Sequence, residues 1–498
     1  MYLSTVSLSY VSLVIMVRTR LTTGGIAEPV VADTAKSLAK MGHRVILLAW
    51  DRTEKFETTT TTEWGTIWRY QEKCTLNNPF VFARKLPGFL WWSTWQILAF
   101  HKLERDIILH YHDLDTLPGG VFTSKILERP LVYDCHENYP GLVKGVVSNT
   151  IANGLHMLES MLLKSCKGII SAGPANYARI KNMLESGIKA PFAATEEEAT
   201  AVMNMAHRDF MNSRLTRIGN VKRLETYPLE KIENRKRGEN FRILYIGVLE
   251  KHPSRGIIET ALTVSKMKGV QFDIGGFGTL VPKLKRIEGK MNNVKYMGSI
   301  HPDNVPLQTI ECDAVLMTLD PANINNRLSA PNKLFEAMAA GVPIITCKEL
   351  LMGQFVEREG IGVTFEWGQW DRLKAAIMKM MFDPQKCAEM GKRARKLAEK
   401  THNWEHCAER LESLYQFVKK TNLEVVSPKF EDVEDKTPKS KPVEKKETPK
   451  SKPAEKKETP KSKPSPAEDE KVQLKGKESK VSTFDKEAFI EAIMQKKE

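Results

Sequence analysis

The chain has 498 residues, of which 41% are apolar, and its formal net charge is +14. Such a chain can bury large cores in two or three domains, which excludes a wholly unfolded protein. Residues 426–498 hold 19 Lys and 16 Asp or Glu, so this stretch carries +3 and the remainder carries +11. A body this basic suits phosphate-bearing ligands, anionic membrane surfaces or nucleic acid, and charge alone does not choose among them.

The N-terminal residues 2–17 are apolar but too short to span a membrane. They lack the early positive charge and the small-residue cleavage site of a signal peptide. Residues 13–17 are therefore predicted to form a buried first strand, with a targeting signal as the alternative. No other segment reads as a spanning helix.

A glycine-containing loop follows this strand. Gly24 and Gly25 precede a predicted helix over residues 28–41 and a strand over residues 44–50. This order of strand, loop, helix and strand is a Rossmann-like opening. The loop lacks a full GxGxxG pattern, so the sequence does not support NAD or FAD binding.

An aromatic stretch, residues 80–100, combines Phe and Trp with Arg84 and Lys85. An exposed surface of this composition would sit well at a bilayer interface. The alternative, which the sequence favours slightly, is a buried helix with the two basic residues in a loop.

Two further apolar strands, residues 106–112 and 131–136, end in polar clusters. In an open parallel sheet, ligands bind beyond the carboxyl ends of the strands. Both clusters should therefore face one crevice. Residues 168–171 are predicted to form another short strand, whereas residues 192–231 show no pattern that places their elements.

A second α/β unit begins at Phe241, with strands predicted near residues 243–247, 271–274, 294–297 and 314–319. The segment 329–345, SAPNKLFEAMAAGVPII, then predicts a loop, a helix and a buried strand. Lys333 and Glu336 would lie in the first turn of that helix, where free N–H groups and the helix dipole favour an anion.

The C-terminal part begins with an amphipathic helix after Asn403. An 11-residue repeat rich in Lys, Pro and Glu follows from Thr437, and it has too few apolar residues to fold. It is predicted to be a disordered linker. Residues 484–494 are either a short docking or membrane-anchoring helix or a frayed end.

The seven cysteines show no CxxC pair and no ligand cluster with histidine. We therefore expect reduced, mostly buried thiols in a cytoplasmic protein, and no metal site.

The segment PNKLFEAMAAGVPI resembles the donor-binding signature of retaining GT-B glycosyltransferases of the group 1 or family 4 type. That family usually carries two glutamates spaced E-x7-E. Glu336 matches the second, whereas Leu328 stands where the first is expected. The resemblance covers roughly residues 11–420 and implies two Rossmann-like doubly wound domains.

The resemblance implies roles for several residues of the second unit. Lys333 and Arg255 would neutralise the donor diphosphate, while Glu336 would bind the ribose and act in catalysis. For the remaining candidates, a binding role and a simpler structural role are equally well supported. Lys251 could be a solvated loop charge, and Gly276 and Gly278 could be turn glycines. The full set of donor-binding candidates is Gly24, Gly25, Lys251, Arg255, Gly276, Asn332 and Lys333.

In the first unit, His112 matches the family histidine that contacts the donor sugar, within the run His110-Tyr111-His112-Asp113. Its catalytic role would be to orient the sugar, because retention in this class is thought to proceed by front-face attack. The acceptor-binding candidates are Asp134, His136 and Glu137.

The resemblance thus implies a glycosyltransferase that moves a sugar from a UDP- or GDP-sugar to a glycan or lipid-linked acceptor with retention. It needs no cofactor or metal, and it lies in the cytoplasm, with peripheral membrane contact and no nucleic acid as partner. Two alternatives remain open: a sugar-nucleotide 2-epimerase of the same fold and a non-catalytic scaffold. A nucleic-acid binder rests on charge alone.

The sequence predicts four segments along the chain. Residues 1–230 form an acceptor-binding domain and residues 231–402 a nucleotide-sugar-binding domain. A crossover helix over residues 403–420 precedes the disordered tail, residues 421–498.

Overall fold

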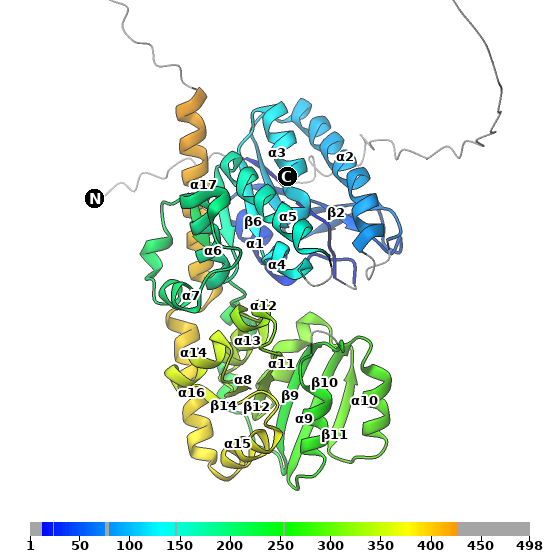
Figure 1. Cartoon of the computed structure of the whole chain (residues 1–498), viewed down its shortest axis with the longest axis vertical. Helices are drawn as coiled ribbons and strands as arrows, with labels where there is room; N and C mark the ends of the chain where they lie inside the picture. Colours follow the sequence, from blue (N-terminus) through cyan, green and yellow to red (C-terminus); the bar gives the residue numbers. More distant parts are fainter. Residues whose placement is uncertain (1–11, 23, 75–78, 145–146, 252–253, 427–498) are drawn as a thin grey trace, which may run out of the picture. The chain divides into compact units, whose positions relative to one another are not determined.

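The computed structural model describes residues 12–22, 24–74, 79–144, 147–251 and 254–426. Two parallel sheets organise these residues in series along the chain (Figure 1). The predicted tail repeat, the terminal helix over residues 484–494 and the first 11 residues lie outside the described part.

The first sheet has eight strands in the order β3-β4-β2-β1-β5-β6-β7-β8, parallel except for the β3–β4 pair. Its strands are β1 (Leu13–Arg18), β2 (Arg44–Asp51), β3 (Thr59–Thr62), β4 (Gly65–Gln71), β5 (Ile107–His112), β6 (Leu131–Cys135), β7 (Gly168–Ser171) and β8 (Leu215–Arg217). β1, β5 and β6 are buried along their whole length, as strands covered on both faces must be.

Helices connect and cover this sheet. They are α1 (Pro29–Lys40), α2 (Pro79–Leu103), α3 (Asp113–Leu127), α4 (Tyr139–Val143), α5 (Asn149–Leu162), α6 (Pro174–Ser186), α7 (Glu196–Met203) and α8 (Leu229–Glu233), with 3-10 turns η1 (Leu163–Ser165), η2 (Gly187–Lys189), η3 (His207–Phe210) and η4 (Leu224–Thr226). α2, α3 and α5 pack side by side. Arg84 and Lys85 belong to α2, so their predicted placement in a loop is wrong.

The second sheet has six parallel strands in the order β11-β10-β9-β12-β13-β14. They are β9 (Phe241–Val248), β10 (Val270–Phe277), β11 (Val294–Gly298), β12 (Ala314–Met317), β13 (Ile344–Cys347) and β14 (Gly362–Phe365). The helices of this half are α9 (Ile257–Val264), α10 (Val281–Glu288), α11 (Val305–Ile310), α12 (Ile324–Leu328), α13 (Asn332–Ala340), α14 (Leu351–Glu359), α15 (Trp370–Phe382) and α16 (Pro384–Lys400), with the 3-10 turn η5 (Pro302–Asn304).

The last helix, α17 (Trp404–Val426), returns to the first sheet, as predicted for a crossover helix. Its Trp404 indole donates a hydrogen bond of 2.8 Å to Ser37 of α1. The hydroxyl oxygen of Tyr415 lies 2.8 Å from Nδ1 of His110 on β5, within hydrogen-bond distance. The two doubly wound halves and the predicted strands are confirmed, while the domain boundaries at 230, 402 and 420 stay predictions.

The seven cysteines are all free and buried, as expected. Within the described residues, no helix combines the length and apolar character required to cross a membrane.

Candidate active site in two halves

In the first half, the strands β1, β5 and β6 end side by side in polar residues. Arg18 at the end of β1 donates from Nη1 to Oδ2 of Asp113 over 2.8 Å. The backbone N–H of His136 donates to the other oxygen of Asp113 over 3.0 Å. Asp113 has a φ of 62°, which is unusual for a residue other than glycine and is found mostly where surrounding contacts hold it. The carboxylate thus fixes three strand ends relative to one another.

A cluster of histidines surrounds the next carboxylate. The β5–β6 register sets His112 directly beside Asp134. Oδ2 of Asp134 lies 3.3 Å from Nδ1 of His112 and 3.4 Å from Nε2 of both His110 and His136. Burial alone would raise the pKa of Asp134, but His136 and hydrogen bonds from the other histidines hold that pKa well below its usual range. Burial lowers the pKa of His112 to about 3, so its imidazole is neutral.

The same cluster has the composition of a metal site. His110, His112 and Asp134 are buried and present ligand atoms within 4.8 Å of one another. Zinc uses imidazole and carboxylate ligands of this kind. This grouping was not recognisable from the sequence, because the ligands come from two strands that only the parallel register brings together.

The acceptor candidates differ in what they present to a ligand. Asp134 is buried beneath its histidines, His136 is partly buried and Glu137 is exposed. Glu137 and His136 are therefore the two that a ligand in the crevice could touch. Asp134 would act through the histidines that it orients.

The Gly24–Gly25 loop of the first half is held by a residue that the sequence did not single out. Gly25 has a φ of 74°, and a Cβ there would lie 2.4 Å from the ring of Phe56. Arg69 of β4 donates to the carbonyl of Gly25 over 2.7 Å. This geometry requires glycine at position 25 and fixes the loop that follows β1.

In the second half, the ammonium of Lys333 lies beside the end of β9. Its Nζ is 4.5 Å from the centre of the Tyr245 ring, and a Cβ on Gly247 would approach that Nζ to 2.7 Å. Gly247 therefore makes room for the lysine. Burial, and then repulsion from Arg255, lower the pKa of Lys333 to about 8, against attraction from Glu336. The second half thus brings two cations and one carboxylate together.

The helix α13 begins at Asn332 without a side-chain cap, and the N–H of Leu334 donates to the carbonyl of Pro331, so the N–H groups of Asn332 and Lys333 are the ones open to a ligand. Arg255 enters from the loop before α9, and its Nε atom is buried without a hydrogen-bond partner. An unpaired guanidinium near a helix N-terminus and a lysine is an arrangement that attracts phosphate.

Lys222 is a contact residue that sequence reasoning missed. It lies in the segment 192–231, where the sequence showed no regular pattern. Its Nζ donates to Oδ1 of Asn332 over 2.7 Å and lies 3.4 Å from Oε1 of Glu336. Lys222 therefore fixes the carboxylate that is predicted to bind the ribose.

The two remaining donor candidates have different surroundings. Lys251 is exposed in the loop after β9. At Gly276 a Cβ would lie 1.8 Å from the carbonyl oxygen of Gly247, so glycine is required there for the β9–β10 contact alone. Their binding roles stay predictions.

Comparisons with known proteins agree with this architecture. The family described as "Glycosyltransferase Family 4" matches residues 23–184, and the family described as "Glycosyl transferase-like" matches residues 255–413. No curated protein matches the sequence.

Among solved structures, sucrose-phosphate synthase from Thermosynechococcus elongatus is 17% identical with a TM-score of 0.62, covering 82% of this chain and all of that one. HepE from Anabaena in complex with UDP and glucose is 16% identical with a TM-score of 0.54, at 82% and 100% coverage. Starch synthase IV from Arabidopsis thaliana is 12% identical with a TM-score of 0.53, again at 82% and 100% coverage.

Two Rossmann-like sheets in series, crossed by a C-terminal helix, define the GT-B class of protein. The chain belongs to the glycosyltransferases of this class, with a family 4 domain in its first half.

Proposed function

We propose that this glycosyltransferase transfers a sugar from a UDP- or GDP-sugar with retention of configuration. The observation that carries the proposal is the convergence of Lys333, Arg255 and Glu336 beside the end of β9. HepE, which has the same fold, has been solved in complex with UDP and glucose and with UDP-glucose, and this supports a nucleotide-sugar donor.

In the proposed reaction, Lys333 and Arg255 neutralise the charge that develops on the departing diphosphate. No metal ion is needed there, because side chains and the first-turn N–H groups of α13 supply the positive potential. Glu336, held by Lys222, accepts hydrogen bonds from the ribose hydroxyls.

His112 is proposed to orient the donor sugar. Its Nδ1 faces Asp134 and His136, while its Nε2 is buried without a hydrogen-bond partner. That second nitrogen is unpaired, and because His112 is buried, a sugar hydroxyl reaches it only when the side chains that cover it shift. The acceptor hydroxyl would then approach the same face that the diphosphate leaves, guided by His136 and Glu137.

The test is nucleotide release from a panel of UDP- and GDP-sugars in the presence of EDTA. We expect release from one donor, lost in both Lys333→Ala and Glu336→Ala. Neither nucleotide release nor nucleotide binding by calorimetry in the native chain would refute the donor site and favour the scaffold. Recovery of a 2-epimerised sugar nucleotide would instead identify the epimerase.

We also propose that the acceptor is a glycan carried on a lipid and that the first half contacts a membrane surface. The outer face of α2 bears Trp91 and Trp95, which are 62% and 54% exposed. At 100° per residue, Arg84 and Lys102 fall on the same stripe, one toward each end of the helix. Indole rings flanked by cations are typical of a helix lying in the headgroup region of anionic lipid.

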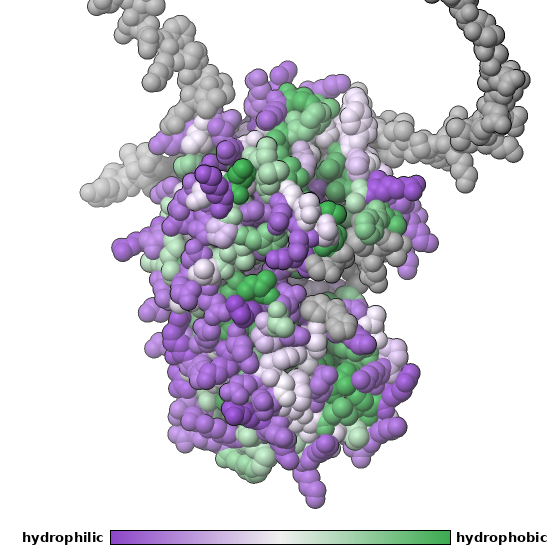
Figure 2. Space-filling view, in the orientation of Figure 1, coloured by the Kyte–Doolittle hydropathy of each residue, from purple (hydrophilic) through white to green (hydrophobic). Residues whose placement is uncertain are grey.

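The neighbouring helices continue this surface. α3 and α5 expose further large apolar side chains, and hydrophobic residues are interspersed across this side of the molecule (Figure 2). The exposed ones are Phe122, Ile126, Ile151, Met157, Leu158 and Met161. In α2, α3 and α5 as described, the acidic residues are all buried, so nothing on these helices repels an anionic surface; the buried acids are Asp113, Asp115 and Glu159.

Flotation with phosphatidylcholine vesicles, with and without 30% phosphatidylglycerol, tests the membrane contact. We expect the native chain to float with anionic vesicles and the double variant Trp91→Ala/Trp95→Ala to partition about tenfold less. The control is Phe382→Ala, at an aromatic on α15 of the second half that is even more exposed than the two tryptophans. Equal flotation of all three proteins would refute this face as the membrane contact.

A further inference from the structure

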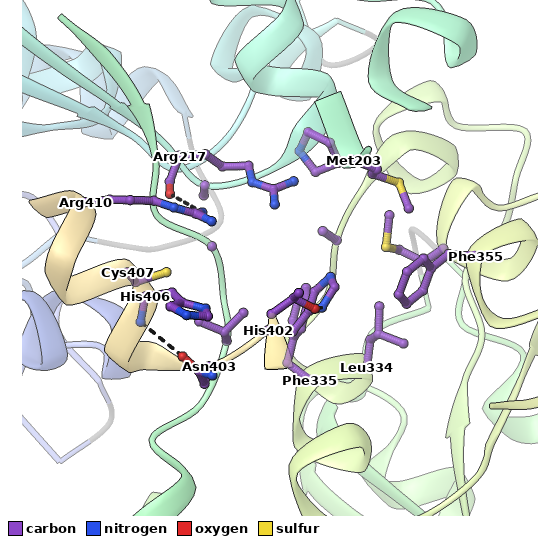
Figure 3. A pocket seen from close by; sticks show the side chains of 17 residues that line it. Met203, Arg217, Leu334, Phe335, Phe355, His402, Asn403, His406, Cys407 and Arg410 are labelled. Atoms are coloured by element: carbon purple, nitrogen blue, oxygen red, sulfur yellow. Dashed lines mark hydrogen bonds between the residues drawn. The ribbon is translucent and has the colours of Figure 1, made fainter. Parts of the chain in front are cut away.

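A second pocket lies at the break between α16 and α17, and α13, the helix that carries Lys333 and Glu336, forms part of its wall (Figure 3). We call it the α16–α17 pocket and define it by Arg217, Phe335, Phe355, His402, His406 and Arg410. Its walls come from the end of β8, from α13 and α14, and from the residues that join α16 to α17. The pocket therefore touches the connections between the two α/β halves.

Two guanidinium groups meet at this pocket. Cζ of Arg410 lies 4.6 Å from the centre of the Phe210 ring, and Cζ of Arg217 lies 5.0 Å from the same ring. Like charges that share one aromatic ring repel each other, and the ring offsets only part of that cost. Burial, and then Arg410, lower the pKa of Arg217 to about 10, which is the signature of a cation lacking a counter-charge.

Within the described residues, no carboxylate offsets the charge of Arg217, although Glu409 attracts Arg410. None of the described residues that line the pocket is acidic. Arg410 is 6% exposed. Its guanidinium donates to Nδ1 of His207 over 3.0 Å and to the backbone oxygen of Arg217 over 3.2 Å. The guanidinium of Arg217 has no hydrogen bond or ion pair to any described residue, and it extends into the space that the labelled side chains enclose (Figure 3).

Further polar groups face the same space. Nδ1 of His406 is buried without a hydrogen-bond partner. His402 is neutral, because burial lowers its pKa to about 4. Phe335 and Phe355 close the other side with apolar rings near His402. The cavity measures about 30 Å³, which suits a small group and not a nucleotide.

We propose that the α16–α17 pocket binds a small oxyanion, a phosphate or carboxylate group, between the guanidinium of Arg217 and that of Arg410. Arg217 supplies the free donors, and its planar fork matches the oxygens of such a group. The site is separate from the donor site, since Leu334 and Phe335 line the pocket while Lys333 and Glu336, on the same helix, contact Tyr245 and Lys222.

Inorganic phosphate is the probe, and thermal unfolding and calorimetry of the full chain are the readouts. At about ten times the dissociation constant, phosphate should raise the Tm of the native chain by about 1–2 °C. Arg217→Gln should weaken phosphate binding at least about tenfold, whereas Arg217→Lys should keep part of it. Arg208→Gln, at a fully solvated arginine on η3, is the matched control and should bind like the native chain.

Phosphate could also enter the donor site, and Lys333→Ala separates the two. The proposal expects the Tm shift to persist in Lys333→Ala and to vanish in Arg217→Gln. A shift that vanishes in Lys333→Ala, or that survives undiminished in Arg217→Gln, would overturn it. No shift and no calorimetric heat in the native chain would overturn it as well, without bearing on donor turnover.

Discussion

Lys333 is expected to destabilise the unliganded protein that it equips for donor binding. Its pKa falls from 10.5 to about 8 in the folded chain, chiefly through burial. A difference of that size between the folded and unfolded states is equivalent to roughly 3 kcal/mol. Since the side chain is only partly buried, we expect about 1–3 kcal/mol. Lys333→Met, which is one atom shorter, carries no charge and packs its sulfur near the Tyr245 ring, should therefore raise the free energy of unfolding by that amount.

The stability cost of Lys333 depends on pH. Below about pH 8 the folded lysine is charged and the full cost applies. Between about pH 8 and 10.5 the unfolded chain binds more protons than the folded chain, so native stability rises with pH and the cost disappears. The difference between Lys333→Met and the native chain should thus be largest at pH 7 and close toward pH 10.5.

Urea unfolding at pH 7 and pH 10 measures this difference, with Lys266→Met as the control at an exposed lysine of the same half. We expect the control to change stability by less than about 0.5 kcal/mol at either pH. If Lys333→Met is less stable than the native chain at pH 7, the contact with Tyr245 outweighs the burial cost, and the reasoning is wrong. Donor binding should be lost in Lys333→Met whatever its stability, because the cation is absent.

Three further outcomes can be measured. Gly276→Ala should lower the free energy of unfolding, measured with urea, by about 3 kcal/mol or more, because its methyl would meet the Gly247 oxygen at 1.8 Å. The control Gly154→Ala, with open space around it inside α5, should raise the free energy of unfolding by about 0.5–1 kcal/mol. Lys222→Met should raise the KM for the donor about tenfold with little change in kcat, since it frees Glu336; an unchanged KM would make it a purely structural contact. Elemental analysis should find less than about 0.1 equivalent of metal per chain; one equivalent of zinc, lost in His110→Ala, would assign the histidine cluster as a metal site.

The sequence predicted much of the fold because its strongest patterns are local. The apolar runs at β1, β5, β6 and β9 and the helix α13 were recognisable from periodicity, glycine and proline. The segment 192–231 was not, since β8 has only three residues and most of its neighbours are single turns; the exception is α7, whose capping box of Thr195 and Glu198 is a local signal that could have been recognised. Such elements depend on tertiary contacts, which leave no periodic trace in the sequence.

The candidate site residues also fall into two groups: those that a local motif contains and those that only the tertiary structure brings together. Lys333 and Glu336 share one helical turn, so a linear motif contained both. The pairing of His112 with Asp134 needed the register of two strands, and the contacts of Lys222 needed a chain reversal of more than a hundred residues. The orientation of α2 was also beyond the sequence, because a helix with aromatic residues all round has no single apolar face to predict. Phe89 and Phe100 are buried, whereas Trp91 and Trp95 are exposed.

The helix α13 links the two sites inferred here. Lys333 and Glu336 meet the end of β9 and Lys222, while Leu334 and Phe335 line the α16–α17 pocket from another side of the same helix. A nine-residue helix moves as one element, so an anion that repositions Phe335 would also move Lys333 and Glu336. By linkage, any effect of the anion on donor affinity must be matched by an equal effect of donor on anion affinity. Calorimetry of phosphate with and without saturating nucleotide would show whether the helix transmits this coupling; identical phosphate affinities would mean that the two sites act independently.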